Sequence, residues 1–266
     1  MKALSFEIDG RRTYGLQQAD RVFEAAAAFR ERHADLRAVL AAGALGELPR
    51  NLAAAAVDAG AMRYLPVIPK PDKIICVGVN YRPHVEEMGR EIPSHPVLFV
   101  RFPGSLVGHL AAVIRPRASE QFDFEGELAV VIGRPARHVA AADAFDVVAG
   151  YTCFMDGSVR DWQRHTMQFT PGKNFDSSGA MGPWLVTPDE IADIESVALT
   201  TTVNGEVMQQ GRVSELIFGI PALIAYCSTF TELLPGDVIA TGTPGGVGAA
   251  RKPPVWLTAG DRVVVD

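Results

Sequence analysis

The stretch that decides the fold reads DFEGELAVVI and covers residues 123–132. Side chains alternate between the two faces of a strand, so an extended chain places Asp123, Glu125 and Glu127 on the same face. The apolar run 128–132 predicts a strand that is buried on both faces. A pair of acids is usually part of a solvated edge strand, but acids that lead directly into a buried strand favour a site for a cation.

A fourth acid, Asp156, ends another apolar run, residues 151–155. Asp156 could be the N-cap of a helix over 158–167. Together with Glu125 and Glu127 it would instead complete a site made only of carboxylate oxygens. Such oxygens, without His or Cys, suit Mg²⁺ or Mn²⁺ better than zinc. We therefore predict a metal site at these three acids.

Cationic and polar side chains follow these acids along the chain. Arg160 and Gln163 are three residues apart and would share one face of a helix. Lys173 follows a glycine, where a lysine is usually exposed, but near the acids it would help to bind an anionic substrate. Upstream, His84 and Glu87 are also three apart, so the carboxylate could orient the imidazole. Taken alone, a His and a Glu on a surface turn indicate no function.

The organisation of the chain changes near residue 70. The first 70 residues predict a small domain, with a strand over Ala3 to Ile8 and helical stretches over Gln18 to Arg32 and Ala34 to Ala42. The Pro-rich residues 66–71 predict an extended linker.

Residues 71–266 predict the catalytic domain, which is rich in strands. Apolar or β-branched runs bounded by Gly, Pro or Asp predict strands over Lys73 to Val79, Val97 to Phe102, Glu125 to Ile132, Asp146 to Phe154, Ala198 to Val203 and Asp237 to Thr241. The predicted helices are Val85 to Gly89, Ser158 to Met167 and Val213 to Tyr226, the last broken at Pro221.

Composition excludes several classes of function. The formal net charge of −6 and the lack of clustered Lys and Arg argue against nucleic-acid binding. The sequence has no window of about 18 uncharged apolar residues and no secretory signal, which predicts a cytoplasmic protein without membrane spans. Its three cysteines, Cys76, Cys153 and Cys227, are expected to be buried free thiols.

The glycine-rich residues 242–248 do not form a nucleotide site. They lack the third glycine and the βαβ context of the dinucleotide fingerprint, and no Gly-Lys-Ser/Thr is present. Their backbone N–H groups, with the hydroxyls of Thr241 and Thr243, could still bind a carboxylate.

In their order along residues 72–266, these segments resemble the fumarylacetoacetate hydrolase family. The resemblance is carried by Gly78-Val79-Asn80-Tyr81 with His84 and Glu87, Asp123 to Leu128, Gly150 to Asp156, Arg160 to Gln163, Gly172 to Asp176, Gly182-Pro183-Trp184, Val203 to Glu206, Pro235-Gly236-Asp237 and Thr241 to Pro244.

The resemblance implies an α+β protein, a mixed β-roll catalytic domain with a small N-terminal α/β domain, acting as a homodimer. It implies Mg²⁺ or Mn²⁺ on Glu125, Glu127 and Asp156, without Asp123, and a lid that carries the catalytic dyad of His84 and Glu87. It also implies a catalytic Lys173 and substrate contacts from Tyr81, Arg160, Gln163 and Thr243. Arg101 stands where members often have Lys, and we expect it to contact the far end of the substrate.

These features predict chemistry on a metal-bound enolate of a 2-oxo acid. Our first hypothesis is hydrolysis of a carbon–carbon bond in a 2,4-dioxo acid such as an acylpyruvate or fumarylpyruvate. Two rivals use the same enolate: decarboxylation of oxaloacetate, and isomerisation of a 2-hydroxymuconate-type or 2-oxohept-3-enedioate-type acid. A rival of another class is a non-catalytic 2-oxo acid binding protein. The motifs do not separate these alternatives.

Overall fold

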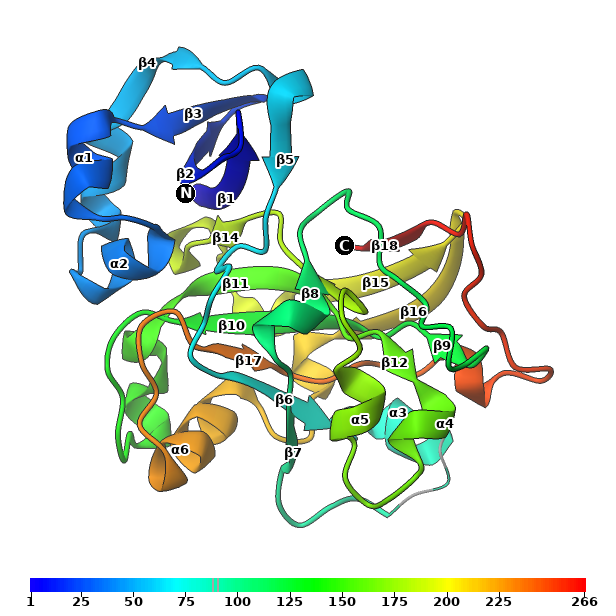
Figure 1. Ribbon diagram of the computed structural model, residues 1–266. Helices are drawn as coiled ribbons and strands as arrows, with labels where there is room; N and C mark the ends of the chain where they lie inside the picture. Colours follow the sequence, from blue (N-terminus) through cyan, green and yellow to red (C-terminus); the bar gives the residue numbers. More distant parts are fainter. Residues whose placement is uncertain (88, 90) are drawn as a thin grey trace.

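The largest element of the computed structural model is a mixed, 13-stranded sheet (Figure 1), and the structure describes residues 1–87, 89 and 91–266. Its main path runs β4-β3-β2-β1-β14-β11-β10-β17-β6-β7. Most neighbours are antiparallel, whereas β17 with β6 and β13 with β8 are parallel. The predicted α+β class with a mixed sheet is confirmed.

The N-terminal part contributes five strands and two helices. These elements are β1 (Lys2–Ile8), β2 (Arg11–Gln18), β3 (Arg21–Ala25), α1 (Ala27–Arg32), α2 (Leu36–Ala41), β4 (Leu52–Ala56) and β5 (Met62–Tyr64).

The remaining strands of the large sheet are β6 (Ile74–Gly78), β7 (Val97–Val100), β8 (Leu106–Val107), β10 (Gly126–Ile132), β11 (Val148–Met155), β13 (Gly179–Met181), β14 (Leu185–Val186) and β17 (Val238–Ala240). Two smaller sheets pair β9 (Phe122–Asp123) with β12 (Ser158–Val159), and β15 (Ala198–Val203) with β16 (Glu206–Arg212) and β18 (Val263–Val265).

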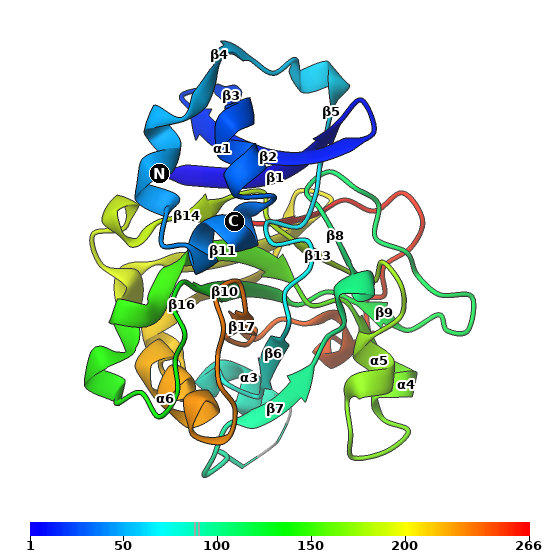
Figure 2. The same ribbon diagram turned by 60° about the vertical axis from the view of Figure 1, so that its left-hand side comes forward.

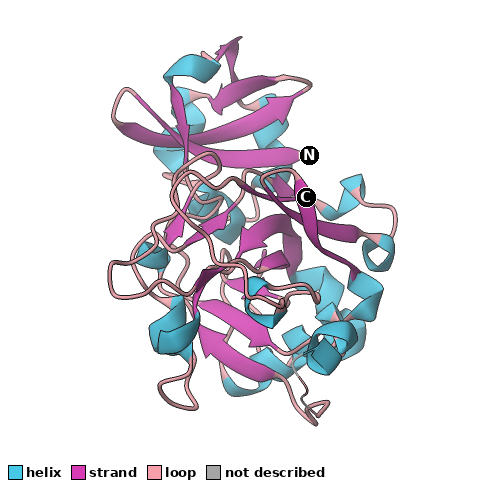
Figure 3. Ribbon diagram, turned by 90° about the vertical axis from the view of Figure 1, so that its right-hand side faces the viewer, coloured by secondary structure: helices cyan, strands magenta, loops and turns pink. Residues whose placement is uncertain are grey.

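Helices in this part are short and lie at the outside of the sheets (Figure 3). They are α3 (Arg82–Glu87), α4 (Arg160–Gln163), α5 (Thr170–Lys173) and α6 (Ile220–Phe230). Turns of 3-10 helix span Leu45–Arg50, Ala59–Ala61, Pro103–Ser105, Ala141–Val147, Pro188–Glu190, Ile194–Ser196, Val213–Glu215 and Gly248–Ala250. No helix in the described ranges has the length and apolarity needed to cross a bilayer.

The central strand β10 is buried on both faces, as the apolar run 128–132 predicts. Ala129 and Val131 pack into one core cluster, where α1 and α2 cover the sheet. Leu128 and Val130 pack into a second cluster, which α6 covers. Because both faces are apolar, polar side chains are confined to the ends of the strand.

The N-terminal strands extend the sheet of the catalytic part. Strand β1 pairs with β14, with Lys2 opposite Val186 and Ala3 opposite Leu185, and Figure 2 shows the blue strands lying over β14 and β11. The first core cluster also joins Phe29 of α1 to Val131 of β10. The boundary near residue 70 stays a prediction.

Three helix predictions need correction. Residues Gln18 to Arg32 are not one helix, because β3 pairs with β2 across a turn in which Ala19 has a left-handed backbone with a φ of 48°, and α1 begins only at Ala27. The helix predicted over Ser158 to Met167 is reduced to α4, since Ser158 pairs with Asp123 in a strand.

The predicted helix over Val213 to Tyr226 is in fact two elements, a 3-10 turn and α6. Pro221 lies in the first turn of α6, where its missing N–H has no cost. Helix α3 begins at Arg82, three residues earlier than predicted. Met88, within the predicted range Val85 to Gly89, lies outside the described residues.

Candidate active site

The three predicted metal ligands meet at the ends of two paired strands. Strands β10 and β11 are antiparallel with Glu127 opposite Phe154, and the N–H of Asp156 donates to the carbonyl of Glu125 at 2.8 Å. One carboxylate oxygen from each of Glu125, Glu127 and Asp156 lies within 4.8 Å of the others, and all three residues are buried. The alternative role of Asp156 as a helix cap is not realised, because the N-cap of α4 is Val159.

Two of these carboxylates are paired with buried cations. Lys173 Nζ lies 2.5 Å from Glu125 Oε2 and 2.6 Å from Asp156 Oδ2. Arg160 Nη2 lies 2.7 Å from Glu125 Oε1, and Arg101 Nη1 lies 2.5 Å from Asp156 Oδ1. Burial opposes ionisation of Glu125, but Arg160 and Lys173 outweigh it and hold the pKa of this carboxyl well below its usual value.

Glu127 has no such partner. It is 2% exposed, and in the described part of the chain its carboxylate makes no ion pair and accepts one hydrogen bond, from Gly242 N–H at 3.0 Å. Burial, with the nearby charges of Asp156 and Glu125, raises the pKa of Glu127 well above its usual value. An ionised carboxylate here needs a cation that the described residues do not supply.

The charges of the cluster therefore fit a divalent cation. Four buried acids, namely the three ligands and Asp123, face three buried cations, Arg101, Arg160 and Lys173. One negative charge is left over. The three carboxylate ligands, one of which has no cation to balance its charge, provide the hard oxygen donors that Mg²⁺ and Mn²⁺ prefer.

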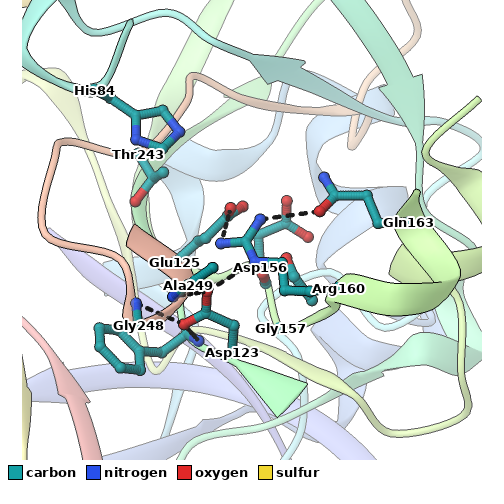
Figure 4. Close-up of polar contacts among 12 residues, drawn as sticks. His84, Asp123, Glu125, Asp156, Gly157, Arg160, Gln163, Thr243, Gly248 and Ala249 are labelled. Carbon is teal, nitrogen blue, oxygen red and sulfur yellow. Dashed lines mark hydrogen bonds and ion pairs between the residues drawn. The ribbon is translucent and has the colours of Figure 1, made fainter. Parts of the chain in front are cut away.

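The predicted dyad lies on α3 at the side of the cluster. His84 Nδ1 is 3.3 Å from Glu87 Oε2, and the Glu87 carboxylate accepts the N–H of Gly246 at 2.9 and 3.0 Å. Figure 4 shows His84 and Gln163 on two sides of Glu125. When Nδ1–H donates to Glu87, Nε2 is left as the basic nitrogen of the ring.

A cavity of about 390 Å³ connects these groups. Its polar wall holds His84, Glu125, Glu127, Arg160, Gln163, Arg164, Thr166, Lys173 and Thr243, and its apolar wall holds Val77, Val79, Phe99, Met167 and Phe169. Most of the predicted site residues thus meet at one cavity.

Arg101 occupies a different place from the one we predicted. Its side chain is fully buried behind Asp156 and is not part of the cavity wall. All five of its N–H donors are used within the protein, by Asp156, by the carbonyl of Gly157, by both oxygens of Ser105, and by Ser178. No donor is left for a substrate, so the geometry gives Arg101 the task of orienting Asp156.

Tyr81 and Thr243 also differ from the predicted arrangement. Tyr81 is buried but does not contribute to the cavity wall, and its hydroxyl has no partner among the described residues. Thr243 reaches the cavity, but its hydroxyl donates to the carbonyl of Gly126 at 2.8 Å. This hydrogen bond fixes the backbone between the two ligand residues, Glu125 and Glu127.

Two positioning residues were given no role by the sequence prediction. Gln209 accepts the N–H of Gly126 at 2.9 Å and donates to Thr243 Oγ1 at 2.8 Å, so it connects the ligand strand to the Thr243 loop. Asp123 accepts Nε of Arg160 at 2.7 Å and the backbone N–H groups of Gly248 and Ala249, as Figure 4 shows. Only the period of the strand pointed to Asp123, and no spacing pointed to Gln209.

Similar proteins identify the family of this chain. The family model described as Fumarylacetoacetate (FAA) hydrolase C-terminal matches residues 73–266. The human protein named oxaloacetate tautomerase FAHD2A, mitochondrial, is 46% identical over 202 residues, which are 75% of this chain and 64% of that protein. Oxaloacetate tautomerase YisK of Bacillus subtilis is 46% identical over 200 residues, 74% of this chain and 66% of the relative. The match thus spans slightly less than two-thirds of these relatives.

Solved structures extend the likeness to the whole chain. A putative HpcE protein from Mycobacterium smegmatis has a TM-score of 0.90 at 36% identity, covering 100% of this chain and 95% of that one. Maleylpyruvate hydrolase from Sphingobium sp. SYK-6, solved with manganese(II) and pyruvate, has a TM-score of 0.79 at 27% identity, with 100% and 95% coverage. On the family match and these identities, the chain belongs to the fumarylacetoacetate hydrolase family.

Proposed function

We propose that this enzyme interconverts the enol and keto forms of a 2-oxo dicarboxylic acid of the oxaloacetate type, with the help of Mg²⁺ or Mn²⁺. The observation that carries the proposal is the buried carboxylate of Glu127, which lacks a cation and faces the same cavity as His84. The relatives named oxaloacetate tautomerases support this choice of reaction over our first hypothesis, carbon–carbon hydrolysis.

The residues that would hold the metal are Glu125, Glu127 and Asp156. When bound there, a divalent cation supplies a Lewis acid for the carboxylate and 2-oxo oxygens of the substrate. The maleylpyruvate hydrolase neighbour, whose structure contains manganese(II) and pyruvate, supports both the metal and the kind of ligand.

His84 is the group suited to move the proton. Glu87 fixes the ring through Nδ1, so Nε2 takes a proton from C3 of the keto acid while the 2-oxo oxygen gains a proton from solvent. In the reverse direction the enol hydroxyl loses its proton to solvent while Nε2–H protonates C3. Glu87 is itself fixed by Gly246 N–H, which keeps the ring in one orientation as it gains and loses its proton.

Lys173 acts as a fixed cation rather than a base. Burial opposes its charge, but Asp156 and Glu125 raise the pKa of Lys173 above its usual value. Two of its three N–H donors are given to these carboxylates. The third has no acceptor among the residues that the structure describes, and since Lys173 lines the cavity it can donate to a substrate oxygen. Negative charge that develops on the 2-oxo oxygen is stabilised by such a preorganised donor.

Hydrolysis of an acylpyruvate is the second candidate. A His–Glu dyad can also take a proton from water, and a solved structure of similar fold is named maleylpyruvate hydrolase. Decarboxylation of oxaloacetate is a third outcome of the same enolate. The anchored dyad argues against a protein that only binds 2-oxo acids.

The deciding assay follows three signals in parallel: the absorbance of enol-oxaloacetate, the release of pyruvate and the release of CO₂. With Mg²⁺ or Mn²⁺ present, a tautomerase accelerates the loss of the ultraviolet absorbance of enol-oxaloacetate without forming pyruvate or CO₂. A hydrolase releases pyruvate from acylpyruvates, and a decarboxylase releases CO₂ from oxaloacetate. If enol decay is no faster than in a His84→Ala control while pyruvate appears from acylpyruvates, the tautomerase proposal is wrong.

Two wider predictions remain proposals. The homodimer follows from the family resemblance, and the cytoplasmic location follows from the sequence, although several relatives carry the word mitochondrial in their names. Gel filtration with light scattering tests the first, and fractionation of the source cells tests the second.

A further inference from the structure

The cationic groups that face the cavity differ in how far they are already paired. Lys173 and Arg160 are both in ion pairs with buried acids, and His84 is in contact with Glu87. Arg164 also contributes to the cavity wall. In the part of the chain that the structure describes, no acid or carbonyl pairs with its guanidinium, so it is the cation free to receive an anion.

The backbone of Arg164 is fixed although its side chain is exposed. Arg164 is the C-cap of α4, and its N–H donates to the carbonyl of Asp161 at 3.1 Å. The Asp161 side chain accepts Ser119 Oγ at 2.7 Å, and the ring of Trp162 packs against Phe175. Because this backbone is fixed, the guanidinium of Arg164 can bind at the rim of the cavity without a loop having to become ordered first.

The surroundings of Arg164 favour an anion at this rim. Met167 and Phe169, which follow it, add apolar wall, and in the described chain no acid joins Arg164 on the cavity wall apart from the ligands Glu125 and Glu127. A carboxylate that emerges between apolar side chains is best bound by a guanidinium, which can donate two parallel hydrogen bonds.

We propose that Arg164 binds the distal carboxylate of the substrate and makes the enzyme select 2-oxo dicarboxylates over 2-oxo monocarboxylates. The inference rests on the proposed function, because that function places the 2-oxo acid end of the substrate at the metal ligands. Gln163, which accepts a hydrogen bond from Arg160 Nη1 at 3.0 Å, precedes Arg164 in the sequence and also lines the cavity.

The test compares two stable acids of equal chain length, 2-oxoglutarate and 2-oxopentanoate, which differ in the distal carboxylate. Binding is measured by calorimetry with saturating Mg²⁺, and oxalate probes the metal end alone. The wild type is expected to bind 2-oxoglutarate at least about tenfold more tightly than 2-oxopentanoate. Arg164→Gln should reduce this preference to less than about threefold and leave oxalate binding unchanged. Arg134→Gln, which changes an exposed arginine away from the cavity, should keep the full preference.

Turnover gives an independent measurement. For enol-oxaloacetate, Arg164→Gln should raise KM by about tenfold with little change in kcat, since the lost contact is uniform between ground and transition states.

Three results would overturn the inference. The first is that Arg164→Gln keeps the preference for the diacid. The second is that it weakens oxalate binding as much as it weakens 2-oxoglutarate binding. The third is that the wild type binds oxalate but shows no preference for the diacid. The last result leaves the proposed function intact. If neither oxalate nor any 2-oxo acid binds with Mg²⁺, the proposed function itself fails, and the role of Arg164 fails with it.

Discussion

The unpaired charge of Glu127 can be tested with two isosteric substitutions in the metal-free protein. Glu127→Gln removes the carboxylate that has no cation, and the amide oxygen can still accept the N–H of Gly242. Glu125→Gln instead removes a carboxylate that is paired with Lys173 and Arg160. The two variants lose the same formal charge from neighbouring positions on one strand, so they are matched controls for each other.

The ion pairs of the site set the expected difference in stability between the two variants. Removing one partner of a buried ion pair costs about 3–5 kcal/mol, because the other charge is left uncompensated. Lys173 keeps Asp156 and Arg160 keeps Asp123, so we expect the lower end, about 3 kcal/mol. For a chain of this size that lowers the Tm of Glu125→Gln by about 6–12 °C. Glu127→Gln should leave the metal-free Tm unchanged or raise it.

The pH dependence of stability tests independently whether Glu127→Gln stabilises the metal-free protein. Burial, Asp156 and Glu125 raise the pKa of Glu127 in the folded state. A carboxyl whose pKa is raised in the folded state binds its proton more tightly in the native than in the unfolded chain. It therefore lowers the free energy of unfolding as the pH rises above 4.5, the ordinary pKa of a glutamate. The advantage of Glu127→Gln over the wild type should therefore grow from mildly acidic to neutral pH.

The assay is thermal unfolding followed by circular dichroism, after chelation and again with Mg²⁺. The wild type gains about 2.7 kcal/mol at a Mg²⁺ concentration of 100 times Kd, and both variants should lose that gain. If metal-free Glu127→Gln melts as far below the wild type as Glu125→Gln does, Glu127 has a cationic partner and the charge count is wrong.

Further predictions concern the dyad, the buried arginine and the thiols. His84→Ala should abolish turnover and change Mg²⁺ affinity by less than about threefold in calorimetry, and loss of the metal would contradict its role as base. Arg101→Met should weaken Mg²⁺ binding by about 10–100-fold, as other groups that orient a ligand do, and Arg101→Lys should restore part of it. At pH 8 the native protein should show no fast-reacting thiol, and three after denaturation, because burial raises the pKa of the thiols, to about 11 for Cys153, about 12 for Cys227 and well above the usual value for Cys76.

The sequence was sufficient to predict the acids of the site because their geometry is local. The side-chain period of a strand relates Glu125 to Glu127, and an apolar run that must be buried brings Asp156 to the end of the neighbouring strand. Antiparallel pairing of β10 with β11 then places the three together. The first step depends on residues two apart, and the last on the pairing of two strands that follow each other in the chain.

The partners of these acids were less predictable because tertiary packing selects them. Arg101 reaches Asp156 only because Gly179 leaves room for it: a Cβ there would lie 2.8 Å from Arg101 Nη2. Nothing in the order of residues distinguishes an arginine that fills this space from one that faces the cavity. In the same way, the pairing of β3 with β2 overrides the helical preference of the alanines around it.

The proposed preference for a dianion follows from the arrangement of charges. Three buried arginine and lysine side chains face four buried acids, so the cluster carries a single negative charge when all four acids are ionised. With a divalent cation it carries one positive charge, and the guanidinium of Arg164 at the rim adds another. In the proposed binding mode a 2-oxo dicarboxylate brings two negative charges, one for the metal ligands and one for Arg164, whereas a monocarboxylate leaves Arg164 unpaired. The carboxylate ligands alone would overcompensate the metal and repel an acid, so on the proposed function the buried cations are what would let this site receive an acidic substrate.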